Sequence, residues 1–313
     1  MAYIIRRIIL FVVTMATVSL ITFSVFQVMP GDPIRIMLGT EADETQVETL
    51  KKQLGLDQPL HIQYMDWVKG LVTGDLGDSI RFSRPVTELL ADRLPVTISL
   101  ALITLIIVVI VAIPLGIFVA KRQNKLSDVV FSSVTQLGMA VPSFWLGMLL
   151  ILYLGMNFSF FTISGYVPWT QSVVGALGAL LLPALTIAIP QIAVKFRYVR
   201  NAILEQLRLD YVRTIRSKGI TEKFVMYKHV LRNSMIPILT VFGLITAEVV
   251  AGTIIVEQVF SLPGIGQLLI TSISYRDFPL VQGIVMYITF VVVFINFIVD
   301  ILYSVLDPRI RLN

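Results

Sequence analysis

The chain has 313 residues, of which 56% are hydrophobic and only 14% are charged, and its formal net charge is +5. Soluble proteins carry about 25% charged residues, so this composition excludes water-soluble, disordered and coiled-coil classes and predicts a polytopic membrane protein. The sequence contains no cysteine and only two histidines, which excludes disulfides, thiolate nucleophiles and cysteine-ligated metal centres.

Six segments are long and apolar enough to cross a membrane, because a helix needs about 20 apolar residues to span the hydrocarbon core. The third and fourth come from an uncharged stretch between Asp128 and Lys195, which the turn-rich residues 157–171 divide. We expect Pro142 and Pro190 to bend these two spans. The sequence therefore predicts an all-α fold with six transmembrane helices, at about 8–28, 94–120, 129–153, 173–194, 234–256 and 280–304.

Most lysines and arginines fall in segments on one side of these spans, namely the N-terminal end, the loop near residue 122, the loop 195–232 and the C-terminal tail. Loops on the cytoplasmic side carry an excess of basic residues. The sequence therefore predicts that both termini are cytoplasmic. It divides into a first transmembrane helix (1–29), an extracytoplasmic helical insertion (30–96) and a transmembrane core (97–313).

The insertion at 30–96 is expected to hold three short helices. Thr40 and Gly55 suit the ends of the first, the second covers about 62–71, and the third begins at Ser83. Short helices with apolar faces indicate a small folded subdomain. It is either a cap on the spans or a docking surface for an extracellular partner.

The basic loop 195–232 is too regular for disorder. Gly219 should end a first, amphipathic helix, and Thr221 should begin a second. Such a helix–glycine–helix segment suits docking to another protein, although binding to anionic lipid or plain packing is equally compatible with the periodicity. The apolar residues of the first helix recur every four positions: Val199, Ile203, Leu207, Tyr211 and Ile215.

The sequence contains no catalytic or metal-binding motif. None of its 19 glycines is followed by lysine, so a Walker A loop is missing. A nucleophile elbow and a zinc-binding His-Glu-x-x-His helix are missing too. We therefore expect no catalytic residue, metal ligand, bound cofactor or nucleic-acid partner for this chain, and any energy from ATP must come from a partner.

Charged and small residues in the fifth span are candidates for the translocation pathway or its gating, since an ionisable group in hydrocarbon is costly. Glu248 could meet a cargo amine or a cation, or pair with a neighbouring subunit. Glu257 could orient the turn at 260–266. Gly243, Ala247 and Ala251 form a small-residue stripe that allows close helix approach, either within the chain or to a neighbouring subunit.

The segments Asp210–Gly219 and His229–Asn233 closely resemble the coupling-loop signature of ABC importer permeases, in particular the B-type permeases of dipeptide, oligopeptide and nickel importers. Arg213, Thr214 and Ile215 stand where the broad motif has Glu-Ala-Ala, and the B-type branch is similar to this sequence in tolerating such changes. Further resembling motifs cover nearly the whole chain: Pro30–Pro33, Leu54–Leu60, Gly74–Gly77, Pro142–Trp145, Val259–Gly266, Arg276–Pro279 and Leu306–Arg309.

This resemblance implies a multi-pass permease of a bacterial cell membrane, half of a pathway that imports di- or oligopeptides by alternating access. It implies four kinds of partner: a homologous second permease, two ATP-binding subunits that hold ATP and magnesium, an extracytoplasmic solute-binding protein, and membrane lipid. Import of nickel or another small solute is the alternative, and a gradient-driven transporter is disfavoured because inverted repeats are not evident. The coupling residues that the resemblance implies are Asp210, Tyr211, Arg213, Thr214, Gly219 and His229.

Overall fold

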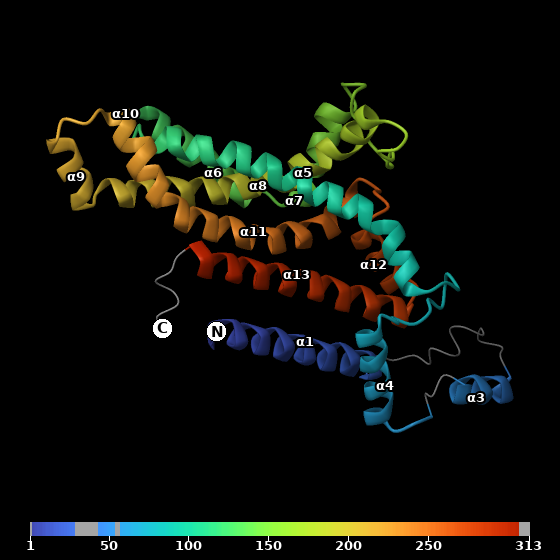
Figure 1. The fold of residues 1–313 in the computed structure, drawn as a ribbon. Coiled ribbons are helices and arrows are strands. Elements are labelled where there is room, and N and C mark those ends of the chain that lie inside the picture. Colours follow the sequence, from blue (N-terminus) through green and yellow to red (C-terminus); the bar gives the residue numbers. More distant parts are fainter. Residues whose placement is uncertain (1, 29–42, 54–56, 307–313) are drawn as a thin grey trace. The chain divides into compact units, whose positions relative to one another are not determined.

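The computed structural model describes residues 2–28, 43–53 and 57–306. Apart from an isolated bridge between Asp78 and Pro85, these residues form helices, turns and irregular segments, which confirms the predicted all-α fold (Figure 1). The helices are α1 (Ala2–Val28), α3 (Glu44–Gln53), α4 (Leu60–Thr73), α5 (Val86–Ala120), α6 (Leu126–Ala140), α7 (Ser143–Leu150), η1 (Ile151–Gly155), α8 (Val173–Leu207), α9 (Asp210–Ser217), α10 (Glu222–Phe224), η2 (Val225–Val230), α11 (Leu231–Val259), α12 (Ile265–Ser274) and α13 (Phe278–Leu306).

Five described helices, α1, α5, α8, α11 and α13, are long and apolar enough to cross a membrane, and the pair α6 and α7–η1 makes a sixth if it counts as one span. This pair is bent by 102°, so the predicted third span over 129–153 is broken into two helices. The bend falls at Pro142, as predicted, because proline disfavours the helical conformation of the residue before it. Val141 is accordingly extended, with ψ 122°.

The predicted third helix of the insertion is not a separate element. It begins at Val86 rather than Ser83 and continues without a break into the second span as α5. Pro95 does not end it, since transmembrane helices tolerate proline where neighbouring groups satisfy the freed backbone. Thr40, Gly55 and the motif residues at 30–33 and 307–309 lie outside the described residues.

The chain divides into two compact units, and the first comprises Met1–Pro95 and Pro263–Phe294. Within it, Ser19 of α1 shares a 2.9 Å hydrogen bond with the hydroxyl of Tyr64 on α4. The Asp277 carboxylate is almost fully buried and accepts hydrogen bonds from the Ser79 hydroxyl and the Arg81 amide, which fixes the loop before α5. The apolar core of this unit joins α5, α12 and α13 through Val86, Leu89, Leu90, Ile265, Leu268, Leu280 and Ile284.

The second unit comprises Val96–Leu262 and Ile295–Asn313. Its central helix is α8, which packs against α6, α7 and α11 and is the most buried of the long apolar helices. Gly116 of α5 permits a close approach to α8, because a Cβ there would meet the Val199 side chain at 2.6 Å. The larger core of this unit is formed mainly by Leu100, Val108, Leu180, Leu182, Ile187, Ile245, Val249, Phe260 and Leu262.

Candidate coupling and translocation elements

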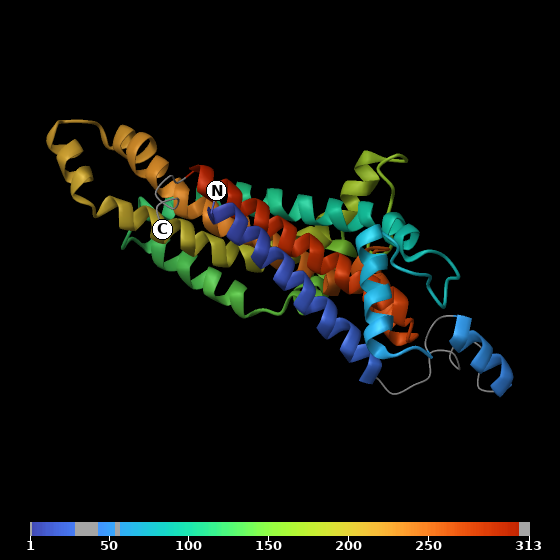
Figure 2. The ribbon, with the colours of Figure 1, turned by 60° about the horizontal axis from the view of Figure 1, so that its bottom comes forward.

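Residues 208–230 form a folded segment at one end of the second unit, between α8 and α11 (Figure 2). The predicted first helix is not continuous, because Leu209 has an extended backbone (φ −73°, ψ 148°) that ends α8 and starts α9. Asp210 then occupies the first turn of α9, where a carboxylate favours the helix N-terminus.

The periodic apolar residues nevertheless share one core, although they belong to two helices. Val212 of α9 is fully buried there with Val225 and Val230 of η2. The predicted face therefore packs as expected, and the break between α8 and α9 leaves its contacts intact. All five residues of the predicted stripe, Val199, Ile203, Leu207, Tyr211 and Ile215, belong to this core or pack against it.

Gly219 makes the turn after α9. Its φ of +76° is in the left-handed region that side chains disfavour, and a Cβ placed there meets nothing within 4 Å. The turn thus requires glycine for its backbone angle and not for lack of space. Across it, the Arg216 guanidinium donates two hydrogen bonds to the Glu222 carboxylate, at 2.7 and 3.1 Å. Thr221 precedes α10 as predicted, but its side chain makes no capping hydrogen bond.

The predicted coupling residues differ in exposure. Asp210, Arg213, Thr214 and Gly219 are exposed. Tyr211 is partly buried, and its hydroxyl donates a 3.0 Å hydrogen bond to Gln206 on α8.

On η2, the predicted residue His229 is partly buried, with its ring 5.6 Å from that of Phe224. Tyr227 is exposed and receives a 2.8 Å hydrogen bond from the Lys121 ammonium, which lowers the pKa of the Tyr227 hydroxyl below its usual value. The segment therefore combines a buried apolar side with an exposed side of mixed charge and aromatic character, a composition suited to protein docking.

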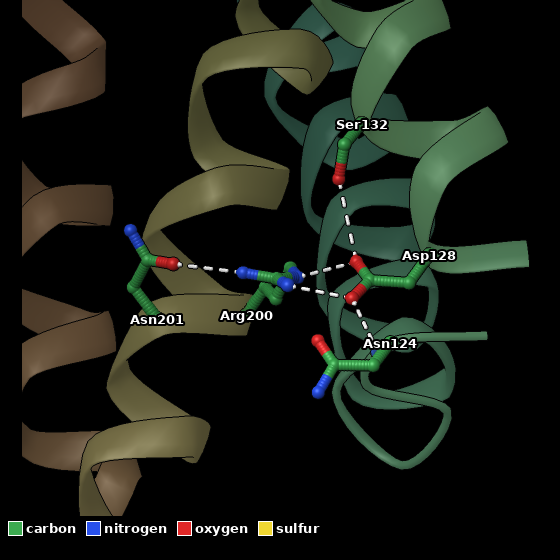
Figure 3. Close-up of polar contacts among 5 residues, drawn as sticks. All are labelled: Asn124, Asp128, Ser132, Arg200 and Asn201. Atoms are coloured by element: carbon green, nitrogen blue, oxygen red, sulfur yellow. Dashed lines mark hydrogen bonds and ion pairs between the residues drawn. The ribbon is translucent and has the colours of Figure 1, made fainter.

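An ion pair fastens α6 to α8 two turns before this segment (Figure 3). Arg200 donates from Nε and Nη2 to the two oxygens of Asp128, at 2.8 and 2.7 Å, and the Asn124 amide adds a third hydrogen bond at 3.0 Å. This pair was not predicted from the sequence. A signal existed, because Asp128 precedes and Arg200 follows the two spans of a predicted hairpin, which returns both to the same side.

A second ion pair joins α8 to α11, where Lys195 Nζ lies 2.9 Å from Glu248 Oε2. The Lys195 side chain is 3% exposed, whereas that of Glu248 is 48% exposed. Glu248 thus has a partner inside its own chain. Lys195 lies within the long helix α8, and not in a loop as the predicted boundary at 195 implied.

The other candidates on α11 are not gathered in one place. Glu257 is fully buried, accepts a 2.6 Å hydrogen bond from Thr97, and receives the Leu262 amide on its carbonyl at 2.9 Å. A Cβ at Gly243 would overlap the Val299 side chain of α13, so this glycine serves packing within the chain. Ala247 is partly buried and Ala251 is exposed.

Two known protein families match most of the chain. Residues 112–312 match the family described as the binding-protein-dependent transport system inner membrane component, and residues 1–101 match the N-terminal part of such membrane components.

Three relatives each align with 99% of this chain. A Brucella abortus (strain 2308) protein, provisionally named a peptide transport system permease protein, is 40% identical over 310 residues and 99% of its own length. The oligopeptide transport system permease protein AppB of Bacillus subtilis (strain 168) is 36% identical, with 99% of its length covered. The glutathione transport system permease protein GsiC of Salmonella choleraesuis (strain SC-B67) is 35% identical, with 98% covered.

The long apolar helices and these matches define a multi-pass membrane permease of the ABC importer class. The chain belongs to the family of binding-protein-dependent transport system inner membrane components. This confirms the resemblance inferred from the motifs.

Proposed function

We propose that the chain forms half of the translocation pathway of an ATP-driven importer of di- or oligopeptides. The relatives named for peptide, oligopeptide and glutathione transport support this cargo, since they match nearly the full length of this chain and glutathione is itself a small peptide. Nickel or another small solute is the alternative cargo. Uptake of labelled peptides against labelled nickel by the reconstituted complex tests the choice, and uptake of nickel alone would refute it.

The 208–230 segment is the element that docks on an ATP-binding subunit. The observation that carries this proposal is its two-sided construction, with Val212 buried and Asp210, Arg213 and Thr214 exposed. The buried side connects the segment to α8 and to the start of α11, so a displacement of the segment is passed to both helices. The exposed side is left for the partner.

The family implies ATP-binding subunits, a second permease and a solute-binding protein in general, and we propose the full set for this chain. Two ATP-binding subunits hold ATP and magnesium, while the homologous second permease completes the pathway. ATP binding draws the two docking segments together and opens the pathway outward, and hydrolysis with product release returns it inward. The chain itself is a transport subunit that binds no cofactor.

The orientation follows from the basic residues around the docking segment. We place the N- and C-termini and the 208–230 segment in the cytoplasm of a bacterial cell, with residues 30–96 outside. A reporter fused after Asn313 tests this placement, and a signal from outside the cell would overturn it.

One face of α11 contributes to the pathway. Glu248, Ala251 and Ile255 are exposed at helical spacing, and a half-exposed carboxylate in an apolar helix is too costly to face lipid. The second permease or the conduit must therefore cover this face. Glu257 acts differently: its buried bonds hold the turn after α11, which fits a role in gating rather than contact with cargo.

Co-purification of the permease with the ATP-binding subunits tests the central proposal. Uptake by the assembled complex should require ATP and should persist after ion gradients are dissipated. Uptake by the permease pair alone, driven by an ion gradient, would instead establish a secondary transporter.

A further inference from the structure

A row of polar side chains crosses the otherwise apolar contact between α8 and α11. The antiparallel register is given by two contacts: a Cβ at Gly252 would lie 3.1 Å from Ile187, and Lys195 binds Glu248 at 2.9 Å. Gln191 lies on α8 between these two levels, one turn from Lys195. The row therefore consists of Gln191, Lys195 and Glu248.

Two hydrogen-bond acceptors in this row remain open among the described residues. The Gln191 side-chain oxygen is buried and receives no hydrogen bond. Glu248 receives the Lys195 ammonium on Oε2, and no described group donates to Oε1, although the side chain is half exposed. A carboxylate can accept about four hydrogen bonds, and an unsatisfied buried acceptor costs stability. Because the Gln191 oxygen is buried, only the exposed side of Glu248 is open to a ligand that donates hydrogen bonds.

The charges define that ligand further. Lys195 is buried, so it is inaccessible to cargo and its ammonium serves to hold the Glu248 carboxylate in place. The exposed side of Glu248 offers negative charge to whatever meets this face. A group that donates N–H bonds and carries positive charge is an ammonium. A peptide carries such a group at its N-terminus.

Building on the peptide-import function proposed above, we propose that Glu248 binds the α-ammonium group of a peptide in transit. Lys195 is a positioning residue that orients the carboxylate. Well-packed apolar residues commonly stabilise a contact between helices as well as an ion pair does, or better. Packing of α8 against α11 therefore does not explain the charged pair, whereas binding of an ammonium group does.

The test uses the complete complex in ATP-loaded proteoliposomes. The probes are radiolabelled tri-alanine and N-acetyl-tri-alanine, each presented on saturated solute-binding protein so that loading does not limit uptake. Glu248→Gln should lower tri-alanine uptake about tenfold, as expected for a lost hydrogen bond to a charged group, and N-acetyl-tri-alanine uptake less than twofold. Lys195→Met should reduce the ratio of tri-alanine uptake to N-acetyl-tri-alanine uptake. Lys195→Arg should keep this ratio close to that of the wild type.

Glu257→Gln is the matched control, because this carboxylate lies on the same helix but is fully buried. It should change uptake of both peptides by one common factor. Equal losses of both peptides in Glu248→Gln would overturn the inference and leave the ion pair as a link between helices. Loss of the second permease on purification of that variant would also overturn it, in favour of a subunit contact. If wild type imports neither peptide, the proposed peptide function fails as well.

Discussion

Replacing Gly219 with alanine isolates the backbone requirement of the turn in the docking segment. No atom lies within 4 Å of the added Cβ, so the cost comes from the φ of +76° alone. A non-glycine residue in the left-handed region costs about 1–2 kcal/mol. Reduced entropy of the unfolded chain offsets about 0.4–1 kcal/mol of this, which leaves a net cost of about 1 kcal/mol.

We expect the turn to relax in the undocked permease and to re-form on docking, so that this cost appears in the affinity for the ATP-binding subunits. The Arg216–Glu222 pair is exposed and contributes at most about 1 kcal/mol. We therefore expect Gly219→Ala to weaken binding of the ATP-binding subunits about fivefold, as measured by titration of the detergent-solubilised permease pair. Gly219→Asn should lose less, since asparagine tolerates left-handed angles.

The variant Gly219→Val provides a second test of the backbone argument in the same binding assay. The space around Gly219 is open, but a β-branched residue is strongly disfavoured at positive φ, so Gly219→Val should weaken docking more than Gly219→Ala. Unchanged affinity in Gly219→Ala would refute the backbone argument. A loss in Gly219→Val no greater than that in Gly219→Ala would also refute it, since the strain at this φ should grow with a branched side chain.

Three further predictions concern the ion pair of α6, the tyrosine of η2 and the orientation. Arg200→Met leaves the buried Asp128 carboxylate uncompensated and should destabilise the permease by about 3–5 kcal/mol in thermal unfolding, whereas Arg200→Met with Asp128→Leu should recover much of the loss. Lys121→Met should raise the pKa of Tyr227 toward its usual value of about 10. The measurement is the ultraviolet absorbance of the phenolate during a pH titration, and Tyr227→Phe identifies the part of the signal that belongs to this residue. An unchanged pKa would contradict the Lys121 contact. A phosphatase fused after Asn313 should stay inactive, since it requires export.

The helices were predictable because their signals are local. Apolar length located the spans, and Gly219 and Pro142 each marked a break that the structure contains. The angle at Pro142 was not predictable, because proline weakens a helix without fixing the direction in which the chain resumes. Pro95 gave the same local signal and yet lies inside α5, where tertiary packing decides.

The candidate site was only partly predictable. Glu248 was predicted as a candidate because a carboxylate in an apolar span is unusual, but its partner Lys195 lies 53 positions away in the sequence. Pairing of this kind depends on the register between two helices, which no local pattern encodes. For Asp128 and Arg200 the predicted hairpin places both residues on the same side, but their pairing again depends on the register between α6 and α8. The apolar repeat before Gly219 predicted the correct packing face and the wrong helix boundary, since periodicity is insensitive to a short break that preserves the face.

The continuity of α8 has a mechanical consequence. Lys195 and Leu207 belong to one helix, and a rise of about 1.5 Å per residue separates them by about 18 Å. Over that length a tilt of about 5° displaces one position by about 1.6 Å relative to the other, which is enough to break a 2.9 Å contact such as that of Lys195 with Glu248. A small swing at the docked end therefore suffices to make or release a charge contact deep in the protein, with no intermediate chain of side chains to relay it.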